Sequence, residues 1–313
     1  MQNAMIHGPS LSALDAAAEV VYRGMAPTRQ RRWPRLDARC GLPVWVKHEN
    51  ETPVGAFKVR GGLVYFDALH RREPEMAGVV AATAGNHGQS VAFAARRYGI
   101  PSQIVVPRHA REGKVRAMRA LGADVVEAGH DFQAAFEAAT RLATERGWHM
   151  VPSFDAQLVL GVASYSLELL RGVPDLETLY VPVGLGSGVC GAIAARDALG
   201  LATRIVAVVA EAAPAYALSA AAGRVISHDV TTRNAAGMAC RTPVADALAI
   251  IRRGADRVVT VSDDQIDEAM SILREDADSD VEGAAAAGLA ALLAESAERR
   301  GESAGIVLTG ARS

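Results

Sequence analysis

Residues 180–191 read YVPVGLGSGVCG, a strand-forming run followed by a glycine-rich turn and the start of a helix. Glycine has no Cβ, so such a turn lets the backbone approach an anion, and successive N–H groups form a nest for a phosphate. The order of strand, glycine turn and helix is typical of α/β proteins with a parallel sheet. The segment therefore predicts a fold class and, after Val183, a phosphate site.

The same alternation of β-branched and alanine-rich runs continues on both sides of this segment. We expect strands at residues 44–47, 78–82, 102–106, 124–127, 178–183, 204–210 and 305–308. Helices should fill the gaps, and Ser10 or Ser12 should cap a first helix. One doubly wound series lies within residues 78–130 and a second begins near Tyr180, so the pattern predicts two doubly wound α/β domains.

The composition describes an ordinary globular chain. It has 313 residues, of which 50% are hydrophobic and 22% charged, and a formal net charge of −2, so we expect no nucleic-acid partner. Cys40, Cys190 and Cys240 are far apart and form no CxxC pair. We therefore expect neither disulfides nor a zinc site, and a cytoplasmic location. The long uncharged stretches at 76–95 and 178–195 contain polar and helix-breaking residues, so we expect no membrane segment.

Two further segments contain candidate functional groups. In HENETPVGAFKVRGG, residues 48–62, Lys58 follows Gly-Ala-Phe and precedes an apolar residue. A desolvated lysine there has a lowered pKa and a free amine for Schiff-base chemistry, whereas the alternative is a solvated lysine at a helix start. In AATAGNHGQS, residues 81–90, a strand meets a helix. The N–H groups of that turn suit a carboxylate, although Thr83 and Asn86 could simply cap the helix.

A dinucleotide site is an alternative use of the glycine turn. Gly186, Gly188 and Gly191 match the pattern GxGxxG, and Glu211 follows about twenty residues on, as in nicotinamide-binding dehydrogenases. That hypothesis leaves Lys58 and residues 83–89 without a role.

Taken together, the three segments resemble the serine/threonine dehydratase family of fold type II pyridoxal phosphate enzymes, which share a tryptophan synthase β-like fold. The run AFKVRG at 56–61 is similar to the family's Ser-Phe-Lys-x-Arg-Gly, and TAGNHGQ at 83–89 is similar to Ser-x-Gly-Asn-His-x-Gln. Ala56 and Thr83 replace the two serines. GLGS at 184–187 replaces four consecutive glycines. Further similarities lie at 237–243, 281–284 and 307–310, so the resemblance covers nearly the whole chain.

The resemblance implies a role for each matched residue. Lys58 holds pyridoxal 5'-phosphate and, once released, acts as the general base. The expected cofactor-binding residues are Lys58, Phe57 against the pyridine ring, Asn86 at its phenolic oxygen, Thr309 near its nitrogen, and Gly184, Leu185, Gly186, Ser187 and Gly188 around the phosphate. The expected substrate-binding residues are Thr83, Ala84, Gly85, Asn86 and His87.

The implied reaction is conversion of a threonine- or serine-like β-hydroxy amino acid to a 2-oxo acid and ammonia. Other β-eliminations and β-replacements remain as alternatives. Ala84 stands where racemising members carry a serine base, which argues against racemisation. Glu211 matches a cation-binding glutamate of some relatives, but residues 212–217 supply no second carboxylate, so we expect no metal.

The resemblance also implies how the chain is organised. Residues 1–65 and 151–313 would form a large cofactor-binding domain, and residues 66–150 a small, mobile domain that closes over the substrate. Residues 154–166 and 235–240 would contribute pocket walls. We expect a homodimer, and no effector-binding domain after Ser313.

Overall fold

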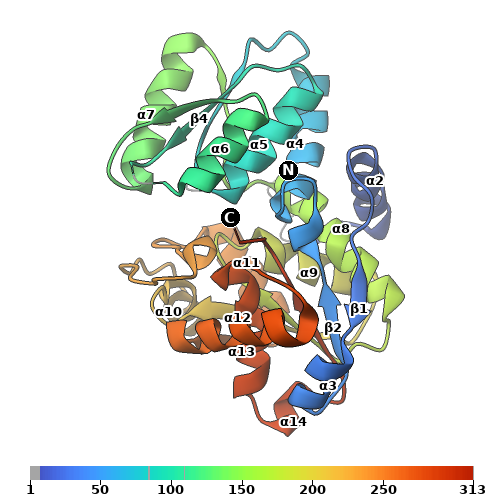
Figure 1. Ribbon diagram of the computed structural model, residues 1–313. Coiled ribbons are helices and arrows are strands. Elements are labelled where there is room, and N and C mark those ends of the chain that lie inside the picture. The colour runs from blue at the N-terminus through green and yellow to red at the C-terminus, as the bar shows by residue number, and fades with distance from the viewer. Residues whose placement is uncertain (1–7, 84, 109, 313) are drawn as a thin grey trace.

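A computed structural model describes residues 8–83, 85–108 and 110–312. It contains two sheets, and Figure 1 shows the smaller one above the larger. The larger sheet has the strand order β1-β2-β10-β7-β8-β9, and only β1 is antiparallel to its neighbour. Its strands are β1 (Gln30–Arg32), β2 (Val44–Lys47), β7 (Thr178–Pro182), β8 (Arg204–Ala210), β9 (Arg257–Val261) and β10 (Ala304–Val307).

Helices bury both faces of the larger sheet. Val206 and Val208 of β8 face one layer, while Ile205 and Ala207 face the other. The first layer contains α3 (Pro34–Cys40), α12 (Asp263–Ala277) and α13 (Gly283–Ala294), and the second contains α2 (Leu11–Tyr22), α8 (Ala156–Gly172), α9 (Ser187–Ala198) and α11 (Ala245–Gly254). Burial on both faces explains why the central strands β7, β8 and β10 are mostly apolar. The shorter elements are α10 (Ala215–Ala222), α14 (Ala297–Arg300) and the 3-10 turns η1 (Glu49–Glu51) and η2 (Ala236–Met238).

The smaller sheet is parallel, with the order β5-β4-β3-β6. Its strands are β3 (Val79–Ala82), β4 (Ser102–Val106), β5 (Asp124–Glu127) and β6 (His149–Met150). One face packs on α4 (Lys58–Arg72), α5 (Asn86–Arg97) and α6 (Glu112–Ala120), and the other on α7 (Phe132–Arg146). This sheet and its helices form a separate layered unit at the top of Figure 1.

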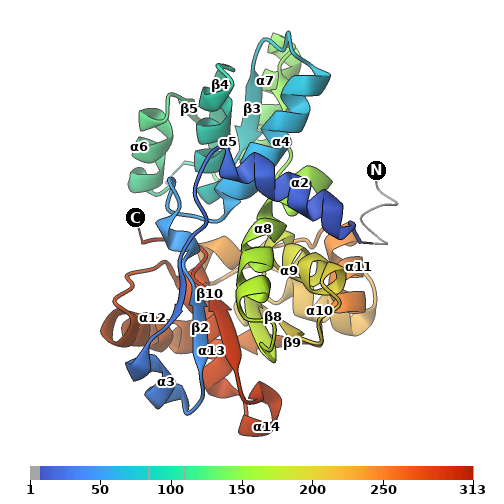
Figure 2. The ribbon, with the colours of Figure 1, turned by 90° about the vertical axis from the view of Figure 1, so that its right-hand side faces the viewer.

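The two units meet where α4 crosses α8. Figure 2 shows α8 lying between the larger sheet and the base of α4, with α2 alongside. A Cβ on Gly61 would lie 2.7 Å from the carbonyl oxygen of Leu158, and one on Gly161 would overlap the carbonyl oxygen of Arg60. The two backbones are therefore in direct contact, so α8 fixes the position of the first turn of α4.

The predicted α/β fold is confirmed. Four predicted strands have the observed bounds, and those at 78–82, 178–183 and 305–308 differ by one residue at one or both ends. Ser10, rather than Ser12, caps the first helix by accepting the Ala13 N–H at 3.3 Å. We missed β1, β6 and β9, because β1 and β6 are only three and two residues long and β9 is a half-exposed edge strand.

The boundaries of the two domains stay a prediction, and the one at residue 65 falls inside α4. No helix in the described part of the chain is both long and apolar enough to cross a bilayer.

The α4–α8 contact predicts the effect of adding one methyl group. Gly161→Ala should lower the free energy of unfolding by about 1–3 kcal/mol, because the new Cβ forces the two helices apart. Arg171→Ala on the same helix removes only a surface ion pair with Asp15 and should cost about 0–1 kcal/mol. Urea unfolding of both variants measures the difference; equal midpoints would contradict the close contact.

Candidate active site

The loops that follow β2, β3, β7 and β10 converge around Lys58. The Phe57 N–H donates to the carbonyl oxygen of Thr309 at 3.1 Å, and Ala56 pairs with Gly310 in an isolated antiparallel bridge. These contacts attach the end of β10 to the start of α4. The parallel strands therefore bring together, at one edge, residues that are some 250 positions apart in the sequence, as expected for α/β sheets.

Lys58 is the first residue of α4. Its Nζ lies 3.4 Å from Ser187 Oγ and 4.7 Å from the centroid of the Phe57 ring. Burial lowers the pKa of Lys58 to about 8, and the negative charge of Glu282 opposes part of that shift. An ordinary lysine is almost fully protonated at neutral pH, whereas this one has an appreciable fraction of free amine.

A small pocket surrounds the Lys58 amine. It is lined by Lys58, Gly61, His87, Ser153, Leu158, Val162 and Ser187. Leu158 and Val162 belong to α8 and make the wall apolar, whereas His87 and the two serines supply polar groups. The pocket therefore combines a desolvated amine with a few polar partners, as binding sites for small molecules commonly do.

The glycine turn after β7 forms a cradle at one side of this pocket. A Cβ on Gly184 would overlap the carbonyl oxygen of Gly237, and Gly186 has a φ of +101°. Within the described residues, no side chain caps the N-terminus of α9, which begins at Ser187. Its first N–H groups point toward the turn and suit a phosphate.

The loop after β3 and the glycine turn meet at this pocket, which His87 and Ser187 both line. Thr83 Oγ1 accepts the Gly85 N–H at 3.0 Å, and Asn86 begins α5. The His87 side chain is 7% exposed, and its Nε2 has no hydrogen-bond partner in the described part of the chain. Burial, together with the Lys58 charge, lowers the pKa of His87 to about 3, so its imidazole is neutral. Ala84 lies outside the described residues.

The Phe57 ring packs against the glycine cradle, since a Cβ on Gly188 would lie 3.8 Å from its Cε2. It meets Tyr165 edge-on, with a centroid distance of 6.0 Å and an interplanar angle of 89°. Tyr165 Oη donates to the carbonyl oxygen of Gly188 at 3.2 Å. The aromatic pair therefore links the start of α4 to the start of α9, and the contact of Phe57 with a pyridine ring stays a prediction.

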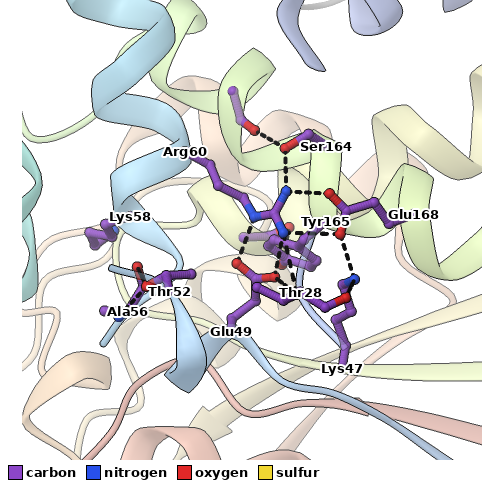
Figure 3. Close-up of polar contacts among 12 residues, drawn as sticks. Thr28, Lys47, Glu49, Thr52, Ala56, Lys58, Arg60, Ser164, Tyr165 and Glu168 are labelled. Atoms are coloured by element: carbon purple, nitrogen blue, oxygen red, sulfur yellow. Dashed lines mark hydrogen bonds and ion pairs between the residues drawn. The ribbon is translucent and has the colours of Figure 1, made fainter. Parts of the chain in front are cut away.

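A buried charged cluster behind Lys58 holds α4 in place (Figure 3). Arg60 Nε donates to Glu49 Oε2 at 2.7 Å, and Arg60 Nη1 donates to Glu168 Oε1 at 2.6 Å and to Ser164 Oγ at 3.0 Å. Lys47 Nζ donates to Glu168 Oε2 at 2.5 Å. Burial alone would lower the pKa of Arg60, but the two glutamates raise it above its ordinary value. Two cations thus balance two carboxylates.

A second cluster connects the two units. Asn86 Nδ2 donates to Glu282 Oε1 at 2.7 Å, and Lys114 Nζ donates to Asn86 Oδ1 at 2.6 Å. Lys114 was missed because a lysine in α6 carries no motif of its own. Glu282 lies within the similar run at 281–284, but its contact with Asn86 spans 196 positions and has no local signal.

Several predicted residues are brought together. Lys58, His87 and Ser187 line one pocket, while Thr309 is buried next to Phe57. Of the two segments predicted as pocket walls, residues 154–166 supply Leu158 and Val162 to the pocket. In the segment 235–240, the carbonyl oxygen of Gly237 faces Gly184. Ser153 was missed, since it lies one position before the first predicted wall.

Comparison with known proteins identifies the class. Residues 21–310 match the family model described as pyridoxal-phosphate dependent enzyme, so the chain belongs to this family. It is 38% identical to an L-threonine ammonia-lyase of Geobacter sulfurreducens, over 82% of this chain and 63% of that protein. It is 31% identical to an L-threo-3-hydroxyaspartate ammonia-lyase of Saccharomyces cerevisiae, over 88% of this chain and 84% of that protein. The maize serine racemase structure superposes with a TM-score of 0.92 at 28% identity, covering 98% of this chain and 94% of that chain. The chain thus spans under two thirds of the Geobacter relative's length.

The residues present fit pyridoxal 5'-phosphate, the cofactor of this family. The glycine cradle at the start of α9 would accept its phosphate, and the Lys58 amine would bind its aldehyde carbon. Family membership also removes the dinucleotide alternative for Gly186, Gly188 and Gly191. In the described residues no three His, Cys, Asp or Glu side chains are grouped for a metal ion, and activity without metal stays a prediction.

Loss of the Arg60 guanidinium should destabilise the folded protein strongly. Arg60→Met leaves Glu49 and Glu168 buried with too few partners, which should lower the free energy of unfolding by about 3–5 kcal/mol. The control Arg29→Ala breaks an exposed ion pair with Glu51 and should cost about 0–1 kcal/mol. Thermal unfolding of the cofactor-free protein measures both, and similar melting temperatures would refute the role of the cluster.

The lowered pKa of Lys58 predicts how capture of pyridoxal 5'-phosphate by the apoprotein depends on pH. Only the free amine attacks an aldehyde, so the initial rate should rise about tenfold from pH 7 and level off above the pKa of about 8. Stopped-flow absorbance follows the capture. A rate that keeps rising toward pH 10 would show an ordinary lysine instead.

Proposed function

We propose that this chain is a pyridoxal-phosphate-dependent ammonia-lyase that converts a β-hydroxy amino acid to a 2-oxo acid and ammonia. The observation that carries the proposal is the Lys58 amine, held with a pKa of about 8 in a pocket beside the glycine cradle. The two curated relatives described above, one named for threonine and one for 3-hydroxyaspartate, support a β-hydroxy substrate. No oxidant is needed, because the substrate loses one water and regains one when the released enamine is hydrolysed.

The cofactor supplies electron storage for the carbanion character that develops at Cα. In this proposal Lys58 attaches it, Gly184, Leu185, Gly186, Ser187 and Gly188 hold its phosphate, and Phe57, Asn86 and Thr309 contact its ring. A threonine hydroxyl near the ring nitrogen leaves that nitrogen largely uncharged, whereas a carboxylate would favour its protonation. An uncharged ring is the weaker electron sink, which favours prompt loss of the β-hydroxyl over a long-lived carbanion.

Lys58 removes the α-proton as general base once its amine is free. With a pKa of about 8, about a tenth of this amine is unprotonated at pH 7, against roughly one in three thousand at the ordinary pKa. Burial thus increases the available base several-hundredfold. The hydroxyl of Ser187, 3.4 Å from Nζ, keeps the amine directed toward the cradle.

The loop at 83–87 binds the substrate carboxylate in this proposal. The positive end of α5 and the N–H groups of Asn86 and His87 favour an anion. The hydrogen bond from Gly85 to Thr83 Oγ1 fixes the turn. Neutral His87 adds a hydrogen-bonding ring without a second positive charge beside Lys58.

The proposal includes the expected assembly. Residues 66–150 form a small domain that moves over the substrate, and two copies of the chain form a homodimer. The partner in the reaction is a free amino acid.

Release of 2-oxo acid from a panel of amino acids tests the function. The holoenzyme should act on threonine, serine or 3-hydroxyaspartate, and Lys58→Ala should lose at least a thousandfold in kcat because the base is gone. Borohydride reduction followed by peptide mapping should place the cofactor on Lys58 rather than Lys47 or Lys114, the other lysines of the chain.

Three outcomes would count against the proposal. A label on another lysine would refute the assignment of Lys58. Release of product only from substrates with other β-leaving groups would favour a different β-eliminase, and release only with an added nucleophile would favour β-replacement.

A further inference from the structure

Lys114, Asn86 and Glu282 form a polar cluster that joins the two sheet units. Lys114 lies on α6 and Asn86 begins α5, both in the smaller unit, while Glu282 precedes α13 in the larger one. Lys114 is 5% exposed, and the direct distance from its Nζ to Glu282 Oε2 is 3.7 Å. The shorter contacts of 2.6 and 2.7 Å both run through the Asn86 amide. The amide therefore links the two charges.

The two charges determine which way the Asn86 amide points. An ammonium has only donors and a carboxylate only acceptors. In the observed orientation the amide oxygen faces Lys114 and the amide nitrogen faces Glu282. A flip would place donor against donor and acceptor against acceptor, so both neighbours disfavour it. Among the described residues the amide nitrogen donates only to Glu282, so its second N–H is available to a ligand.

The choice of lysine at position 114 is itself informative. The chain contains only three lysines, Lys47, Lys58 and Lys114, so 30 of its 33 lysine and arginine residues are arginine. Lys47 belongs to the buried cluster around Glu168, and Lys58 lies in the pocket. A lysine ammonium is a compact point charge, whereas an arginine presents a planar fork. Lys114 occupies a buried position where one donor must reach one amide oxygen.

The cluster faces the same site as Lys58. The charge of Glu282 acts on the Lys58 amine. A Cβ on Gly310 would lie 3.1 Å from Asn86 Nδ2 and would overlap Glu282 Oε1. The cluster is therefore packed directly against the segment that follows Thr309.

We infer that Lys114 and Glu282 are positioning residues that fix the Asn86 amide, so that its free N–H donates to the phenolic oxygen of bound pyridoxal 5'-phosphate. Because Glu282 comes from the other sheet unit, the amide is held in this way only when the two units are in contact. This inference rests on the cofactor and on the proposed contact of Asn86 with it, not on the lyase reaction.

Cofactor titration of the apoprotein tests the inference without any measurement of turnover. Lys114→Met keeps the length of the side chain and removes its charge, and Glu282→Gln keeps the shape and allows either amide orientation. Each should weaken binding of pyridoxal 5'-phosphate at least fivefold and shift the visible absorption maximum of the bound cofactor. Arg116→Met, on the same helix but in an exposed ion pair with Glu112, is the matched control and should bind as the wild type does.

The melting temperature, measured with and without cofactor, shows whether the cluster positions the Asn86 amide or only stabilises the contact between the two units. If Lys114→Met and Glu282→Gln melt at lower temperature yet retain the wild-type affinity and spectrum, the cluster only braces the two units and the inference is wrong. Should Lys114→Met fail to fold, wild-type affinity and spectrum in Glu282→Gln would still refute the inference. These binding and absorbance measurements do not depend on turnover. A protein that releases no 2-oxo acid could therefore refute the proposed reaction and still support the role of Lys114 and Glu282.

Discussion

The Arg60 guanidinium holds together the parts of the chain on which the site depends. It bonds Glu49, just after β2, and Glu168 and Ser164 on α8, and it lies two residues beyond Lys58. Separating these buried charges would leave each without compensation, which is far more costly than losing a surface pair. The first turn of α4, and with it the Lys58 amine, is therefore fixed relative to both β2 and α8.

Contacts between glycines and neighbouring backbone complete the frame that this cluster begins. Gly61 and Gly161 allow α4 and α8 to touch, and a Cβ on Gly191 would lie 3.0 Å from the backbone of Ala163. The helix α9, whose first turn belongs to the glycine cradle, thus packs directly on α8, and Arg60 bonds α4 to the same helix. One helix positions both the group that would bind the phosphate and the amine that would bind the aldehyde carbon.

The charges in the site are distributed in a consistent way. Lys58 and Lys114 each share the influence of Glu282, and burial lowers the pKa of both lysines. His87, which lines the pocket with Lys58, is neutral. The site therefore has a modest excess of positive charge, which suits anionic groups, and its Lys58 amine is easily deprotonated. Adding or removing one carboxylate would disturb this balance.

The sequence by itself determined the α/β fold, most of the strands and, through three local motifs, the family. Each motif is local, because a strand, a glycine turn and the start of a helix fit within a dozen residues, as at 180–191. It also placed Lys58, since the AFKVRG run carries its own pattern. Only the tertiary structure decided which partners surround these motifs: Glu168 for Arg60, Glu282 and Lys114 for Asn86, and Ser153 in the pocket. Such contacts join positions up to 196 apart, and a single sequence contains periodicity and propensity but no distances between remote side chains.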